Sequence, residues 1–176
     1  MIFDELNEFA DAASVAATAG TAVVGDVIDL GNTTTYLGNG GEPVYVVIEC
    51  TTQMITAGSA GTIQFFLVSD SLATLGSATV ASCTTHATSL AIVTDDATAI
   101  GVGIAAGTAT YLPNQASTVN STGARKPILL VQLPPGPYER YLGILKTVAT
   151  TECTAGAVNA YLTKNPKLYT SLPDAI

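Results

Sequence analysis

Residues 127–149 read PILLVQLPPGPYERYLGILKTVA, and the expected class of fold follows from this stretch. It contains two apolar runs, 127–133 and 140–149, separated by the sequence PPGP at 134–137. Both runs are short and rich in aliphatic, β-branched and aromatic side chains, which favour β-strands. Three prolines and a glycine between them are typical of a rigid turn and prevent one helix from spanning the whole stretch. The pattern therefore predicts two strands joined by a rigid connection.

Similar runs recur along the chain, and Gly, Pro and Asn separate them. No segment has the length and periodicity of a long helix. Six or seven short strands with this punctuation are typical of two packed antiparallel sheets. We therefore predict an all-β fold, a jelly-roll-like antiparallel β-sandwich with an extended N-terminal arm. The predicted strands cover residues 23–30, 44–51, 62–68, 89–93, 127–133, 140–149 and 157–162.

The N-terminal segment differs from the rest of the chain. Its first eleven residues predict a short amphipathic helix, because apolar side chains recur there at spacings of three and four. Such a short helix is marginal in water, so it must dock on its own domain or on a neighbour. Residues 12–21 are small and weakly patterned, which indicates an extended arm. We divide the chain into an arm (1–22), a β-sandwich domain (23–164) and an extended tail (165–176).

Charge is sparse and unevenly distributed. Only 11% of the 176 residues are charged, and the formal net charge is −8. All six Lys and Arg residues lie at or after Arg125, whereas most carboxylates precede it. An acidic chain is repelled by nucleic acid and by anionic lipid, so we expect no direct nucleic acid binding. We also expect no membrane partner, because no stretch approaches the roughly 18 apolar residues of a membrane span.

The sequence offers little for catalysis or metal binding. The three cysteines are far apart and form no CxxC motif, so we expect buried free thiols, as in a protein made in a reducing cytoplasm. His86 is the only histidine and stands among small polar residues, which predicts a solvent-facing loop position. A zinc site or a Ser-His-Asp triad would have to include it. We therefore expect no enzyme activity, no cofactor and no catalytic or metal-binding residue.

Four segments share a resemblance to a known family. Residues 1–12 (MIFDELNEFADA) and 131–142 (VQLPPGPYERYL) resemble the capsid cement, or decoration, proteins of short-tailed bacteriophages. Residues 41–45 and 154–163 are similar to segments near that family's start and end, in the same order. The resemblance implies a jelly-roll virion protein, made in the cytoplasm of a host bacterium. It would self-associate as a homodimer or homotrimer, bind the outer surface of an HK97-like capsid and bridge neighbouring major capsid subunits.

This resemblance and the residue types suggest an interface with the capsid or with another copy. Apolar residues of the arm would anchor it on a neighbour, or would instead cap its own sandwich. The PPGP loop would dock with little loss of freedom. Arg140 would pair with Glu139 or reach a capsid carboxylate, and both alternatives stay open. The candidate interface residues are Ile2, Phe3, Leu6, Phe9, Pro134, Pro135, Gly136, Arg140, Lys164 and Lys167.

Two other functions compete with the cement hypothesis. A jelly-roll module that binds carbohydrate or a receptor would normally expose an aromatic platform, and the chain has no Trp and only seven Tyr and four Phe. An enzyme with an unrecognised carboxylate site would use a pair such as Asp95 and Asp96. A turn is the simpler explanation for that pair, because it stands where a predicted strand ends.

Overall fold

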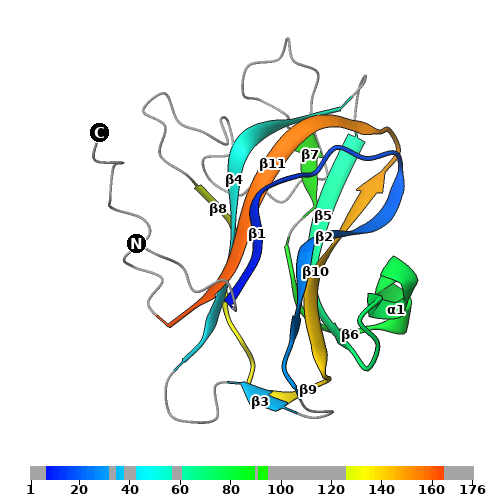
Figure 1. Ribbon diagram of the computed structural model, residues 1–176. Helices are drawn as coiled ribbons and strands as arrows, with labels where there is room; N and C mark the ends of the chain where they lie inside the picture. Colours follow the sequence, from blue (N-terminus) through cyan, green and yellow to red (C-terminus); the bar gives the residue numbers. More distant parts are fainter. Residues whose placement is uncertain are drawn as a thin grey trace.

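The computed structural model shows two antiparallel β-sheets packed face to face (Figure 1). The first sheet has the strand order β1-β11-β4-β8, and the second has the order β2-β10-β5-β6, with β7 also paired to β5. Strands β3 and β9 form a separate small sheet at one end. The structure describes residues 7–31, 35–37, 43–56, 61–89, 91–94 and 126–164.

Each sheet draws its strands from distant parts of the chain. The first sheet contains β1 (Glu8–Ser14), β4 (Tyr45–Thr56), β8 (Lys126–Gln132) and β11 (Cys153–Thr163). The second contains β2 (Gly20–Asp29), β5 (Gly61–Asp70), β6 (Thr84–Thr88), β7 (Ile92–Thr94) and β10 (Tyr141–Ala149). The small sheet and the two helical turns are β3 (Thr35–Leu37), β9 (Gly136–Tyr138), α1 (Leu75–Ala78) and the 3-10 turn η2 (Val80–Ser82).

The connections have the topology of a jelly roll. The chain passes from the first sheet to the second between β1 and β2, returns at β4, and crosses again at β5, β8, β10 and β11. Its first strand, β1, pairs with its last, β11, with Glu8 opposite Tyr161. The predicted all-β, jelly-roll-like antiparallel sandwich is therefore confirmed.

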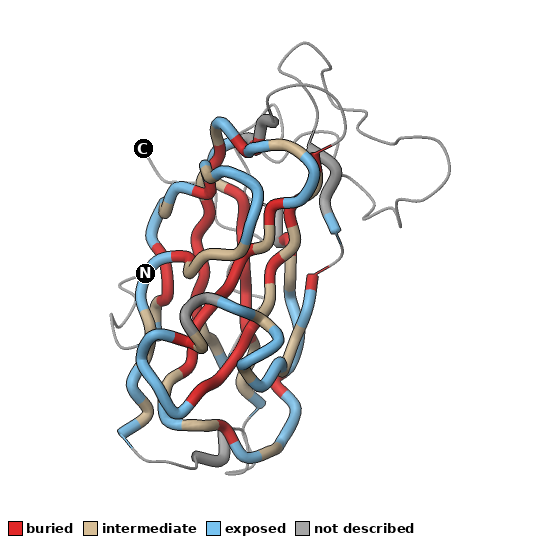
Figure 2. Tube along the Cα trace, turned by 90° about the vertical axis from the view of Figure 1, so that its right-hand side faces the viewer, coloured by how far each residue is buried: buried red, intermediate tan, exposed pale blue. Residues whose placement is uncertain are grey.

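The core lies between the two sheets and follows the alternation expected of strands. In β5, Ile63, Phe65 and Leu67 are fully buried and point the same way. In β10, Leu142 and Ile144 meet them from the neighbouring strand of the same sheet. Figure 2 shows buried residues continuing along the middle of both sheets. The inward side chains of the first sheet include Val46, Ile48, Cys50, Val158 and Ala160.

The N-terminal residues that the structure describes belong to the sandwich. Residues 8–11 form part of β1, so the predicted helix is wrong there, and Phe9 is fully buried in the core. Gly25 lets β1 approach β2 closely, because a Cβ at Gly25 would collide with the carbonyl oxygen of Phe9. Residues 8–22, which we assigned to an arm, thus form β1, β2 and their connection. The predicted C-terminal tail, 165–176, lies outside the described residues.

The short helix α1 covers part of the outer face of the second sheet. Leu75 at the start of α1 is fully buried against Val68 and Leu145. Gly143 leaves the space that Leu75 needs, since a Cβ at that glycine would collide with the leucine side chain. The glycine at position 143 in β10 therefore allows α1 to pack closely on the sheet.

One cation is buried in the core. Lys146 lies between the inward residues Ile144 and Val148 of β10 and is only 4% exposed. Its Nζ atom donates a hydrogen bond to the carbonyl oxygen of Ser14, 3.3 Å away across the sandwich. Burial lowers the pKa of Lys146 below its ordinary value of 10.5, and this effect outweighs the opposite influence of nearby Cys153. Desolvation of this ammonium group therefore costs folding free energy.

We predict that Lys146→Met stabilises the fold by about 1–3 kcal/mol at pH 7, because it removes a poorly compensated buried charge. The unfolded chain binds this proton more tightly than the folded chain, so wild-type stability rises with pH between the folded pKa and about 10.5. Urea denaturation at pH 7 and pH 9.5 measures both effects. The exposed Lys164→Met variant serves as the control. A less stable Lys146→Met protein would contradict the prediction.

Candidate docking surface

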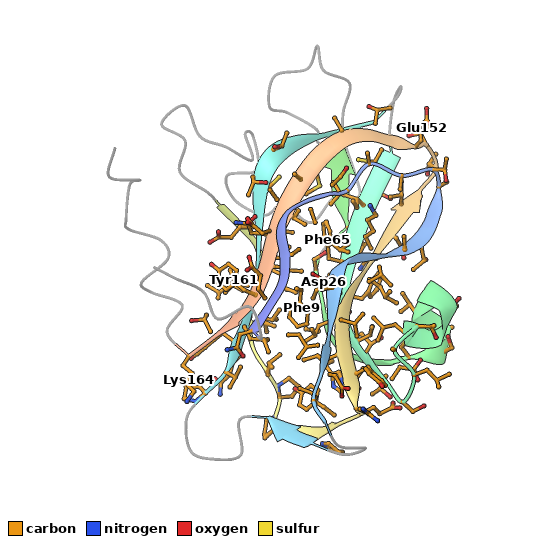
Figure 3. The ribbon with its side chains drawn as sticks, in the orientation of Figure 1. Phe9, Asp26, Phe65, Glu152, Tyr161 and Lys164 are labelled. Carbon is orange, nitrogen blue, oxygen red and sulfur yellow. The ribbon has the colours of Figure 1, made fainter. Side chains whose placement is uncertain are left out.

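Several candidate interface residues meet at one end of the sandwich, here called the proline end. In the first sheet, Tyr45 pairs with both Gln132 and Thr163, so the segments that follow β8 and β11 emerge together. Figure 3 places Lys164 at this end and Glu152 at the other. The proline end comprises Pro134, Pro135, Gly136, Arg140 and Lys164.

The loop that carries the prolines is held at several points. Pro134 and Pro135 are exposed, but Gly136–Tyr138 forms β9 and pairs with β3. The side chain of Tyr138 is fully buried, and its hydroxyl donates a 2.8 Å hydrogen bond to the carbonyl oxygen of Pro134. Burial raises the pKa of Tyr138 to about 12. Because proline also fixes φ, the conformation of this loop is restricted.

A polar network beneath the loop joins it to the second sheet. The Oγ atom of Ser69 in β5 lies 2.7 Å from Nε2 of His86 in β6 and accepts a hydrogen bond from the backbone N–H of Glu139. The His86 ring lies 4.1 Å, centroid to centroid, from the ring of Tyr138. His86 is thus half-buried in a strand, and the predicted solvent-facing loop position is wrong. Cross-strand pairing of β6 with β5 produces this burial.

Ser69 and His86 lie as close together as the two residues of a catalytic dyad, but the site is closed to a substrate. Ser69 is 0% exposed, so a substrate cannot reach its hydroxyl group. The carboxylate of Glu139 accepts a 2.7 Å hydrogen bond from Thr84 rather than from His86. This arrangement orders the loop and offers no accessible nucleophile. The described residues also contain no cluster of three metal-binding side chains, and Asp95 and Asp96 lie outside them.

Arg140 forms an ion pair with another residue of the protein surface. Its Nε and Nη2 atoms donate to the two carboxylate oxygens of Asp29 at 2.9 and 2.8 Å, and its guanidinium lies 5.0 Å from the ring centre of Tyr141. This ion pair holds the pKa of Asp29 at about 2. Within the chain, the partner of Arg140 is Asp29 and not the adjacent Glu139, so the first of our two alternatives is wrong. The second, contact with a capsid carboxylate, stays a prediction.

Of the remaining candidates, the structure describes only Phe9. Phe9 is a core residue, which excludes it as an exposed anchor. The structure also shows features that sequence reasoning missed, namely the buried Tyr138 and the exposed Leu130 and Val131 in β8. The sequence signal that could have identified Tyr138 is its position directly after the PPGP turn. Outside the described residues lie Ile2, Phe3, Leu6 and Lys167.

The cysteines behave as structural residues. Cys50 and Cys153 are buried, Cys83 is partly buried, and all three are free thiols. Burial raises the pKa of Cys83, aided by the carboxylates of Asp70 and Glu139. A thiol with a raised pKa is a weaker nucleophile near neutral pH. The expected free thiols are confirmed, although Cys83 is less buried than predicted.

Comparison with known proteins adds no assignment. No known protein family matches the chain, and no curated protein is significantly similar to it. Within the described ranges, no helix has both the length and the apolar character needed to cross a membrane. Function therefore has to be inferred from the fold and from the proline end.

We predict that His86 titrates below 6.5, because burial lowers its pKa and outweighs the opposing effect of Glu139. The unfolded chain then binds more protons, so the free energy of unfolding decreases as pH falls through about 6.5 towards the folded pKa. NMR titration measures this directly, since the chain has a single histidine. Urea denaturation from pH 7.5 to 5 measures the linked stability.

Glu139→Gln provides the matched control for this titration. Removing the carboxylate should lower the midpoint of His86 further. In His86→Gln, which keeps an acceptor for Ser69, this contribution to the pH dependence should disappear. A wild-type midpoint at or above 6.5 would show that burial does not dominate.

Proposed function

We propose that this protein is a capsid decoration, or cement, protein. It binds the outer surface of an HK97-like phage capsid and bridges neighbouring major capsid subunits, as a structural component of the virion. The observation that carries the proposal is the proline end, where an exposed loop is held in one conformation by a jelly-roll core. One of the segments that resemble cement proteins, 131–142, contains this same loop.

The geometry of the loop suits a protein that must hold a shell together. Tyr138 and the pairing of β9 with β3 order the loop before binding, so contact with a capsid costs little conformational entropy. Pro134 and Pro135 supply exposed apolar surface, and Lys164 supplies a positive charge at the same end of the sandwich. A subunit that touches two capsomers makes its second contact at high effective concentration, so many weak contacts together stabilise the shell.

The described surface gives the competing binding function no support. The large hydrophobic side chains exposed in the described residues are Leu72, Leu130 and Val131, and none of them is aromatic. Carbohydrate recognition typically stacks sugar rings on exposed aromatic side chains. The exposed aliphatic side chains and the exposed Pro134 and Pro135 provide apolar area that a protein contact can bury.

Co-sedimentation with expanded cognate capsids that lack decoration protein tests the function. We expect saturable binding at a fixed ratio to the major capsid protein. Lys164→Gln should weaken binding several-fold and reduce its salt dependence, because it removes an exposed charge at the proline end. Ala149→Glu makes the same change in net charge at the exposed far end of β10 and should bind normally. Absence of binding to intact shells would refute the proposal.

Tyr138→Phe tests whether loop order matters for docking. The variant loses the hydrogen bond to Pro134, which should cost about 1 kcal/mol of stability, and should also bind capsids more weakly. Tyr45→Phe removes a hydroxyl at the same end of the first sheet without affecting the loop, and it serves as the control. Equal capsid affinity for the two folded variants would exclude a role for the Tyr138 hydroxyl.

A further inference from the structure

Strand β8 forms an exposed apolar edge of the first sheet. It is the last strand in the order β1-β11-β4-β8, and within the described residues no strand pairs with its other side. Leu130 is 44% exposed and Val131 is 36% exposed. Figure 1 shows β8 beside β4 at the margin of the sheet. Among the residues that the structure describes, this edge is therefore apolar and has no partner strand.

The backbone at this edge has hydrogen-bonding groups directed outward. The N–H of Leu133 donates to the carbonyl oxygen of Val44 in a continuation of the β8–β4 ladder. Alternate residues of an antiparallel strand face the same neighbour, so Val131 faces β4 as Leu133 does. Leu130 and Gln132 then present their N–H and C=O groups to the open side. Such groups are a template for another strand.

The edges of β1 and β2 differ from β8 in charge. Strand β1 carries Glu8 and Asp11, and β2 carries Asp26 and Asp29, with a register shift opposite Gly25. Charges and bulges are common devices that keep strand edges from pairing with other molecules. From residue 127 to residue 138, in contrast, the chain contains no charged side chain. Strand β8 has such features only at its beginning, where Lys126 and Pro127 lie and the register with β4 shifts between Ile48 and Glu49. Residues 128–132 carry no charge and no proline, so pairing along this part of β8 meets no such obstacle.

We propose that the open edge of β8 pairs antiparallel with β8 of a second copy, so that the first sheets of two protomers become one continuous sheet. Two chains of net charge −8 repel each other, and contact through the uncharged stretch 127–138 reduces this repulsion. In a two-fold symmetric pair, each outward N–H group of one β8 strand meets an outward C=O group of the other, because the two strands are identical. The charge and the symmetry both favour a second copy as the occupant.

The two residues whose backbone groups face the open side, Leu130 and Gln132, define the register of the paired strands. Leu130 lies opposite Gln132 of the partner subunit, and the two Val131 side chains meet at the two-fold axis. Val131 and its symmetry mate then form a non-hydrogen-bonded pair, whose Cα atoms are about 4.5 Å apart in antiparallel sheets. The dimer does not depend on the proposed capsid function, and it presents two proline ends.

Sedimentation velocity over a concentration series, without any capsid, tests this dimer. Wild-type protein should change from monomer to dimer as concentration rises, and Leu130→Lys should remain monomeric over the same range. Leu72→Lys is the matched control, because Leu72 is more exposed (61%) and precedes α1 on the second sheet. It should dimerise like wild type. Dissociation of both variants would attribute the effect to net charge and overturn the proposal.

A cysteine at the axis gives an independent readout. Val131→Cys in a Cys83→Ser background should form an intermolecular disulfide under mild oxidation, since the expected Cα separation lies within disulfide range. Leu72→Cys in the same background should not. Wild-type protein that stays monomeric, together with no Val131→Cys disulfide, would overturn the proposal. If the wild-type protein stays monomeric and Leu130→Lys abolishes its capsid binding, the edge of β8 pairs with a strand of the capsid protein instead. That result also overturns the proposal.

Discussion

Burial of Tyr138 joins the core of the sandwich to its proline-rich loop. The ring belongs to the main hydrophobic cluster and packs against His86, while the hydroxyl group holds the carbonyl of Pro134. The next residue, Glu139, donates its N–H to the buried Ser69. Loop conformation at this end is therefore set by the same packing that stabilises the two sheets. Any surface built on Pro134 and Pro135 is ordered before a partner arrives.

The fold class could be predicted because the central strands have a strong pattern. In β5 and β10, aliphatic, β-branched and aromatic side chains form short runs between turn-forming residues, and this pattern is typical of strands. Strand β1 was predicted as a helix because Phe9 also fits a helical spacing. Its strand conformation depends on pairing with β11, about 150 residues away, and on a bulge in which Asn159 accepts the N–H of Ala12. Local sequence does not contain that information.

The candidate surface could be predicted only in part for the same reason. The PPGP turn is visible in the sequence, and the structure exposes Pro134 and Pro135. The partner of Arg140 is Asp29, which is 111 residues away, and sequence reasoning considered only the adjacent Glu139 and an external group. His86 stands among small polar residues, yet the pairing of β6 with β5 brings it to Ser69. Long-range strand pairing decides the environment of both side chains.

Two of the described basic residues in the C-terminal part of the chain contribute little positive charge to the surface. Arg140 is neutralised by Asp29, and Lys146 is buried between the sheets. Of Arg140, Lys146 and Lys164, the first and the last are exposed at the proline end, and the charge of Arg140 is balanced by that of Asp29. Electrostatic attraction at this end is therefore weaker than the sequence suggests, and exposed ion pairs contribute little free energy in any case. Proline side chains and the apolar edge of β8 must then supply most of the binding energy of any contact made there, through burial of apolar surface.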